Sequence, residues 1–174
     1  MKNTYELIFA GTGGQGLVTS GIMIAKAGIM DGKNALQTQS YGVAQRGGFS
    51  SAEVIISDNE ILYQKVQHPD VIIALNDIAI DRYKNIKTNV LYDCGMMKNC
   101  DALGWHGIPF HEIAQKLGSP KMANLVAIGA MIEKVPVVSF TSLAEVIKQK
   151  FKPAIADMNI EAVKVGMETA RTMK

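Results

Sequence analysis

The chain has 174 residues, of which 48% are hydrophobic and 20% are charged; this is the composition of a globular protein and excludes the disordered class. A net charge of +2 and an aromatic content of 6% argue against a nucleic-acid-binding surface. Two cysteines are too few for a disulfide scaffold and favour a reducing compartment. The sequence shows neither a signal-peptide pattern nor a membrane span, so we expect a cytoplasmic protein with a single domain over residues 1–174.

The first part of the chain alternates short apolar runs with one helical segment. We predict strands at residues 5–10, 34–39, 52–57 and 61–66, the last as a short edge strand. A helix is predicted at residues 17–30, where Gly21, Ala25 and Gly28 fall on one face and allow close packing on a sheet. Asp31-Gly32 ends this helix. Residues 40–51 are polar and rich in glycine, which predicts a loop.

The middle of the chain continues the strand pattern. Residues 70–75 (DVIIAL) form a nearly continuous apolar run, which is typical of a central parallel strand covered on both faces. A helix at residues 77–84 and strands at residues 89–93 and 107–110 follow. These segments predict an α/β fold: a single Rossmann-like, doubly wound, mostly parallel sheet with flanking helices. Such a sheet binds its ligand beyond the carboxyl ends of its strands.

The last third is predicted to be helical. One helix spans residues 111–117 and closes at Gly118, and another spans residues 122–132, which are uncharged and apolar nearly all round, as in a core or interface helix. Ser142 and Glu145 have the spacing of a capping box. From Pro153 on, one apolar stripe is predicted to face the core: Ile155, Met158, Ala162, Val163, Gly166, Met167 and Ala170.

A glycine cluster links the first predicted strand to the first helix. The candidate binding residues here are Gly11, Gly13, Gly14, Gln15 and Gly16. Glycines allow a tight turn, and the free amides at the start of the helix favour a phosphate. The alternative is that the glycines only let the helix pack close to the sheet. A dinucleotide site also needs an acidic residue about 20 positions further on. Because 36-LQTQ-39 has none, a conventional NAD(P) dehydrogenase is not expected.

A second glycine-rich segment carries more side-chain chemistry. Its candidate residues are Ser40, Tyr41, Gly42, Arg46, Gly47 and Gly48. The Arg46 guanidinium can clamp a phosphate or a carboxylate through two hydrogen bonds. The alternative is that Arg46 pairs with an acid across a subunit interface while Gly47 and Gly48 allow a close turn.

We find no catalytic set and no metal site in the sequence. Cys94 and Cys100 are too few for an iron–sulfur cluster, which normally needs four thiolates. His68, His106 and His111 lack metal-ligand spacing, and His111 is expected to lie on the surface at a helix start. Ser50 and Ser51 lack the G-x-S-x-G pattern of a hydrolase.

Four segments together resemble a known family: 11-GTGGQG-16, 38-TQSYGVAQRGG-48, 52-AEVIISDNEILYQKV-66 and 70-DVIIAL-75. They resemble the gamma subunit of 2-oxoacid:ferredoxin (acceptor) oxidoreductases, and most closely that of the 2-oxoglutarate enzyme. The resemblance covers nearly the whole chain. One departure concerns the second glycine segment, where the 2-oxoglutarate branch usually reads S-Y-G-P-E-A-R-G-G and this chain has Val43, Ala44 and Gln45 in the middle. The V-A-Q-R-G-G of this chain also resembles the M-A-Q-R-G-G of the equivalent domain in the indolepyruvate enzyme, so the 2-oxoacid is left open.

The resemblance implies a complex that converts a 2-oxoacid and coenzyme A to acyl-CoA and carbon dioxide and passes the electrons to ferredoxin. It implies that thiamine diphosphate and the iron–sulfur clusters lie on partners, namely alpha and beta chains and a ferredoxin-type subunit. This chain alone would hold no cofactor and catalyse no reaction, with coenzyme A as a ligand shared with its partners.

On this basis the two glycine segments are expected to converge at the carboxyl edge of the sheet. There they would dock on the thiamine-binding chains or hold the phosphates of coenzyme A, and a contact between two copies of the chain is left open. Two other interpretations stand beside this one. The chain could be a freestanding nucleotide-binding module or small NAD(P) or flavin reductase, or it could be a scaffold that binds no ligand.

Overall fold

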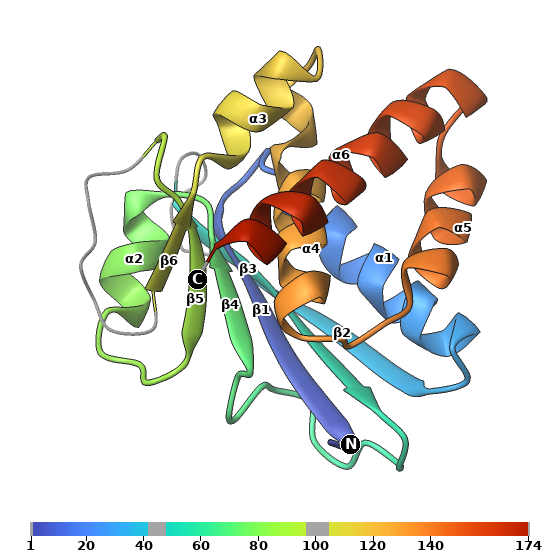
Figure 1. Ribbon diagram of the computed structural model, residues 1–174. Helices are drawn as coiled ribbons and strands as arrows, with labels where there is room; N and C mark the ends of the chain where they lie inside the picture. The colour runs from blue at the N-terminus through green and yellow to red at the C-terminus, as the bar shows by residue number, and fades with distance from the viewer. Residues whose placement is uncertain (1, 42–47, 97–104, 174) are drawn as a thin grey trace.

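A six-stranded sheet forms the middle of the molecule, with the strand order β2-β3-β1-β4-β5-β6 (Figure 1). The structure is a computed structural model and describes residues 2–41, 48–96 and 105–173. The strands are β1 (Thr4–Thr12), β2 (Asn34–Tyr41), β3 (Phe49–Ser57), β4 (Val71–Ala74), β5 (Asn89–Asp93) and β6 (Trp105–Ile108). Strands β1, β4, β5 and β6 pair in parallel, and β3 runs antiparallel to both β1 and β2. The predicted mostly parallel α/β fold is confirmed.

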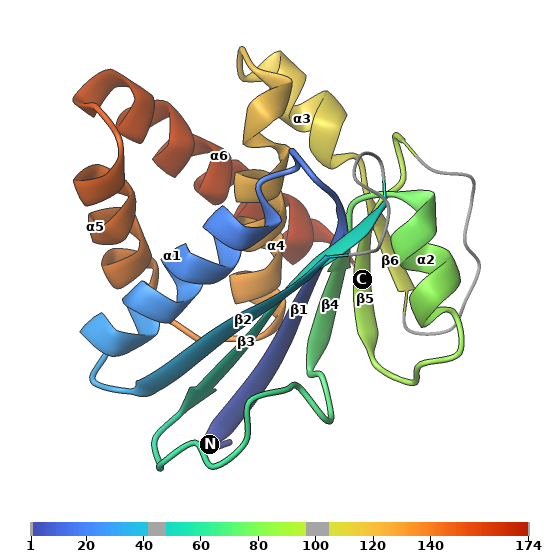
Figure 2. The same ribbon diagram turned by 180° about the vertical axis from the view of Figure 1, so that it is seen from behind.

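Helices cover both faces of the sheet. They are α1 (Leu17–Met30), α2 (Asp77–Tyr83), α3 (Phe110–Lys116), the 3-10 turn η1 (Pro120–Met122), α4 (Ala123–Lys134), α5 (Phe140–Lys150) and α6 (Pro153–Thr172). Helix α2 packs on one face, and the other helices gather on the opposite face, with α6 lying across α4 (Figure 1, Figure 2). Within the described residues, no helix is both long and apolar enough to cross a membrane.

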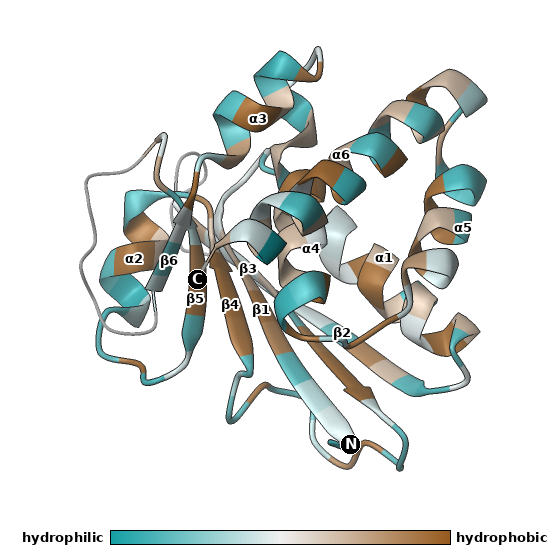
Figure 3. Ribbon diagram, in the orientation of Figure 1, coloured by the Kyte–Doolittle hydropathy of each residue, from teal (hydrophilic) through white to brown (hydrophobic). Residues whose placement is uncertain are grey.

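The central strand explains why the core has two halves. All four residues of β4 are buried, and the strand is hydrophobic along its length in Figure 3. Successive side chains of a strand point to opposite faces. Ile73 therefore joins the core under α1 and α4, whereas Ile72 joins the core under α2. The prediction of a central parallel strand covered on both faces is confirmed.

Helix α4 is a core helix, because Ala123 to Ile132 are buried without a break. Two glycines let it meet α6 backbone to backbone. A Cβ on Gly129 would lie 2.0 Å from the carbonyl oxygen of Val163, and a Cβ on Gly166 would lie 2.0 Å from that of Val126. The apolar stripe predicted on α6 is wrong at its start, since Ile155 and Met158 are 48% and 43% exposed. Burial on α6 follows the contact with α4 rather than hydrophobicity alone.

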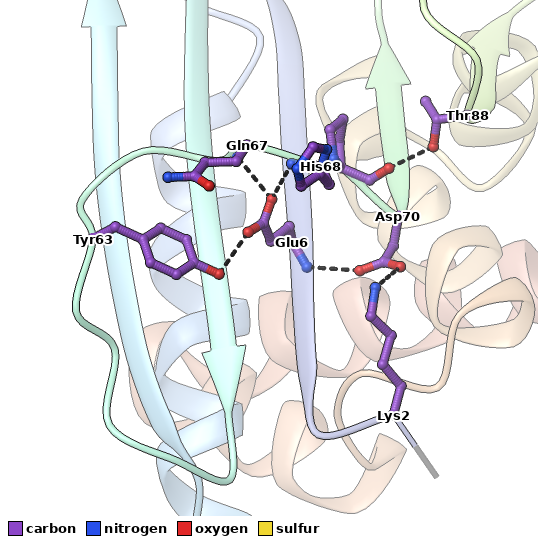
Figure 4. Close-up of polar contacts among 8 residues, drawn as sticks. Lys2, Glu6, Tyr63, Gln67, His68, Asp70 and Thr88 are labelled. Atoms are coloured by element: carbon purple, nitrogen blue, oxygen red, sulfur yellow. Dashed lines mark hydrogen bonds and ion pairs between the residues drawn. The ribbon is translucent and has the colours of Figure 1, made fainter.

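Residues 58–70, which we call the strap, do not form the predicted edge strand at 61–66. Side-chain bonds to the sheet hold the strap instead (Figure 4). The Glu6 carboxylate, 5% exposed, accepts hydrogen bonds from the Tyr63 hydroxyl at 2.7 Å and from the backbone amides of Gln67 at 2.7 Å and His68 at 2.5 Å. The strap amides thus donate to a buried carboxylate, which replaces the ladder bonds of a strand.

The start of α5 is also different from the prediction. Ser139, not Ser142, is the N-cap, and its hydroxyl accepts a hydrogen bond from the Ser142 amide at 3.1 Å. Asp31 at the end of α1 accepts bonds from the Ser139 amide at 2.6 Å and the Ser142 hydroxyl at 2.5 Å. Burial alone would raise the pKa of Asp31, but the hydrogen bonds from Ser142 and Ser139 hold it below its usual value.

Two other boundaries shift. The segment predicted as a loop at residues 40–51 is shorter, because Ser40 and Tyr41 belong to β2 and residues 49–51 belong to β3. Pairing between β2 and β3 extends to Tyr41 opposite Ser50, and ladder bonds override the turn-like composition. The strand predicted at 107–110 is β6, which ends at Ile108, and Phe110 begins α3.

Candidate functional site

The first glycine segment lies at the carboxyl end of β1 and leads into α1. Gly16 is the N-cap of α1 with a φ of 74°, and Gly14 has a φ of 91°, so both adopt the left-handed conformation that favours glycine. The side chain of Gln15 holds the turn through two hydrogen bonds to the backbone. Its Oε1 accepts a hydrogen bond from the Thr12 amide at 2.8 Å, and its Nε2 donates to the Leu75 carbonyl at 2.9 Å. The turn is therefore tied to the end of β4.

The reason why a glycine is needed differs from one position of this turn to the next. A Cβ on Gly11 would lie 2.2 Å from Gln15 Oε1, and a Cβ on Gly16 would lie 2.6 Å from Asn124 Nδ2, so both positions are needed for packing. A Cβ on Gly13 would meet no atom within 4 Å, and its φ is not positive. Packing and backbone conformation thus account for Gly11, Gly14 and Gly16 but not for Gly13.

A pocket of about 830 Å³ opens beside the turn. It is lined by the turn and α1, by Leu75 after β4, by His111, by η1 with the residue before it, by the start of α4, and by Phe151 and α6: Gly14, Gln15, Gly16, Thr19, Met23, Leu75, His111, Ser119, Pro120, Lys121, Met122, Ala123, Asn124, Leu125, Phe151, Ile155, Met158 and Asn159. The exposed side chains Ile155 and Met158 belong to its wall. Among these lining residues Lys121 is cationic and none is acidic. The pocket is therefore mostly apolar, with a polar end that suits an anion.

Sequence analysis missed a polar pair at the rim of this pocket. Asp93, the last residue of β5, is fully buried, and its carboxylate contacts Nδ1 of His111. The same carboxylate accepts hydrogen bonds from the amides of His111 at 3.1 Å and Gly95 at 3.2 Å. His111 lies at the start of α3, as expected, but it is only 26% exposed and lines the pocket. The position of Asp93 at the carboxyl end of a predicted parallel strand was the available signal.

The second glycine segment leaves the sheet at the same edge. Ser40 and Tyr41 end β2, and Gly48 precedes β3, whereas Gly42, Arg46 and Gly47 lie outside the described residues. Tyr41 pairs with Ser50, which in turn pairs with Gly11. The structure therefore brings the ends of both glycine segments to one edge, with a single strand between them.

Cys94 is the cysteine that lies in the part of the chain that the structure describes. Burial raises the pKa of the Cys94 thiol, and the nearby Asp93 carboxylate raises it further, so the reactive thiolate is disfavoured. Cys100 lies outside the described residues. Over the part of the chain that the structure describes, no three His, Cys, Asp or Glu side chains are placed to hold a metal ion.

Comparison with known proteins decides the family. The family described as pyruvate ferredoxin/flavodoxin oxidoreductase matches residues 6–169. The chain belongs to this family. The 2-oxoglutarate synthase subunit KorC of Archaeoglobus fulgidus is 35% identical over 98% of this chain and 90% of its own length. The KorC subunit of Methanothermobacter marburgensis is 37% identical over 94% of this chain and 95% of its own.

Solved structures agree with the sequence relatives. The gamma subunit of a keto/oxoacid ferredoxin oxidoreductase from Geobacter sulfurreducens has a TM-score of 0.85 and 33% identity, covering 97% of this chain and 99% of that one. A 2-oxoglutarate:ferredoxin oxidoreductase from Magnetococcus marinus, with 2-oxoglutarate, coenzyme A and succinyl-CoA bound, has a TM-score of 0.91 and 28% identity. It covers all of this chain, which matches 32% of that longer one. The predicted resemblance is confirmed: this is a gamma subunit of a 2-oxoacid:ferredoxin oxidoreductase.

Proposed function

We propose that this gamma subunit serves a 2-oxoglutarate:ferredoxin oxidoreductase, which converts 2-oxoglutarate and coenzyme A to succinyl-CoA and carbon dioxide. The support is the match to KorC subunits over at least 90% of both chains. The partners are alpha and beta chains that hold thiamine diphosphate, together with a ferredoxin-type subunit that holds iron–sulfur clusters. The gamma subunit acts within this cytoplasmic complex as one domain and catalyses no reaction alone.

Within that complex, the carboxyl edge is proposed to hold the phosphates of coenzyme A. The observation that carries this proposal is Gly13, where neither packing nor backbone conformation in the lone chain requires a glycine. A glycine at such a position allows a ligand to approach the backbone closely. The neighbouring Gly14 lines the pocket together with the start of α1 and Lys121, which add positive potential there, and none of the described lining residues is acidic. Arg46, in the neighbouring segment, is proposed as a second phosphate ligand.

The test is a methyl group added at Gly13. Gly13→Ala should leave the free energy of unfolding within about 0.5 kcal/mol of the wild-type value, because the new Cβ meets no atom. It should raise the KM for coenzyme A by about tenfold in the assembled complex, since the Cβ displaces a phosphate from the turn. Steady-state kinetics and urea unfolding measure the two effects.

Gly16→Ala is the matched contrast for this experiment. Its Cβ would meet Asn124, and its φ is 74°, so this variant should lose stability. An unchanged KM for coenzyme A in Gly13→Ala would contradict the role of the turn. Tight binding of NAD(P) or FAD by the lone chain would instead favour a freestanding nucleotide-binding protein.

A further inference from the structure

Asp93 and His111 make one contact more than the start of helix α3 requires. The carboxylate of Asp93 already anchors the start of α3, because it accepts the backbone amide of His111 at 3.1 Å. The additional contact with Nδ1 of the imidazole is not required to begin that helix. It fixes the orientation of the ring, since a buried carboxylate and a ring N–H make a strong, directional hydrogen bond.

The ring is held at the rim of the pocket. His111 lines the pocket together with the glycine turn and Lys121, and its side chain is 26% exposed. Within the described chain, no residue forms a hydrogen bond with Nε2 of His111. With Nδ1–H directed at Asp93, a proton on Nε2 makes the ring a donor on its other side. The positive ring charge is then balanced by the Asp93 carboxylate.

We infer that His111 is a ligand-contacting residue that donates a hydrogen bond from Nε2 to a phosphate oxygen of coenzyme A, with Asp93 as its positioning residue. The inference rests on the proposed function of the carboxyl edge and names a further residue of that site. Lys121, the start of α1 and His111 all present donors or positive charge to a pocket whose described lining holds no acidic side chain. An anion is the ligand group that all three accommodate.

The experiment uses the assembled complex with isotope-labelled histidine in this chain alone, titrated with coenzyme A and separately with pantetheine, which lacks the phosphates. The chain has three histidines, so His111→Gln identifies the His111 ring signals, and His68, on the strap, is the internal reference. Coenzyme A should shift the Nε2 signal of His111 and leave His68 unchanged. Pantetheine at the same concentration should leave both unchanged.

Affinity measured by calorimetry provides the second readout. His111→Ala should weaken binding of coenzyme A by about tenfold, the usual loss for one hydrogen bond to a charged group. His111→Gln, which keeps an N–H donor, should recover part of this loss, and His106→Gln is the matched control with no expected effect. If His111 had only a structural role, His111→Gln and His111→Ala would bind coenzyme A with the same affinity.

The outcomes separate this inference from the proposed function. If coenzyme A binds but the His111 signals do not move, or if pantetheine moves them equally, the role of His111 is overturned and the proposed function stands. If neither the chain nor the assembled complex binds coenzyme A, the proposed function fails, and this inference fails with it.

Discussion

Gln15 shows how a single side chain maintains the shape of the glycine turn. Its amide group bonds the end of β1 through the Thr12 amide and the end of β4 through the Leu75 carbonyl. A Cβ at Gly11 would clash with this same amide, so the glycine and the glutamine depend on each other. The role of Gln15 is therefore to fix the backbone of the turn.

We predict that Gln15→Ala lowers the free energy of unfolding by about 1–3 kcal/mol, because two part-buried backbone groups lose their partner. Urea unfolding measures the change. Gln39→Ala, at an exposed position of β2, is the control and should remain within about 0.5 kcal/mol of wild type. Equal losses in the two variants would show that the bonds of Gln15 contribute nothing specific.

The close crossing of α4 and α6 depends on contacts between the two helices and not on the properties of either helix alone. Gly129 and Gly166 each face the backbone of the other helix, and each allows an approach that no side chain would permit. Glycine costs a helix interior about 1 kcal/mol relative to alanine. The close crossing offsets this cost by burying Ala123 to Ile132 of α4 between the sheet and α6.

We predict that Gly129→Ala destabilises the protein by about 3 kcal/mol or more, because the new methyl group would meet the rigid backbone of α6. Gly28→Ala in α1 is the matched comparison. Its Cβ would lie 2.7 Å from Ile56 Cδ1, the end of a side chain that can move, and the loss should be smaller. Thermal unfolding of both variants tests this order, and the reverse order would contradict backbone contact at the crossing.

At the scale of the whole molecule, the strap joins distant parts of the sheet. It runs from the end of β3 to the start of β4, and Glu6 of β1 receives its hydrogen bonds (Figure 4). Asp70 extends the connection by accepting the Glu6 amide at 2.9 Å. The hydrogen bond to Glu6 raises the pKa of Tyr63, with smaller contributions from burial and from the Glu6 charge.

This raised pKa predicts a pH dependence of stability. Because the pKa of Tyr63 is higher in the folded state, its contribution is complete below the ordinary tyrosine value of 10.0 and is lost as the pH rises through the folded value. Wild type should therefore be more stable than Tyr63→Phe at pH 8, and the difference should shrink above about pH 10. Urea unfolding over this range measures it, and a constant difference would refute the bond to a charged Glu6.

Local pattern was enough for most elements of this protein. The helix at residues 17–30 and the apolar strand within residues 70–75 were predictable because the helical period and a two-sided apolar run are properties of adjacent residues. The glycine turn and the family were predictable from motifs of the same short range. Local pattern failed at residues 61–66 and at Ser142, where partners distant in sequence determine the structure.

The sequence by itself therefore determined the order of the elements and the mostly parallel sheet, whereas the edge where a ligand binds stays a prediction. Only the tertiary structure placed His111 against Asp93 and separated Gly13 from the glycines that packing requires. The physical reason is that hydrogen-bond partners and steric contacts depend on which surfaces meet. His68 and Glu6 are 62 residues apart, and no local period specifies that they bond.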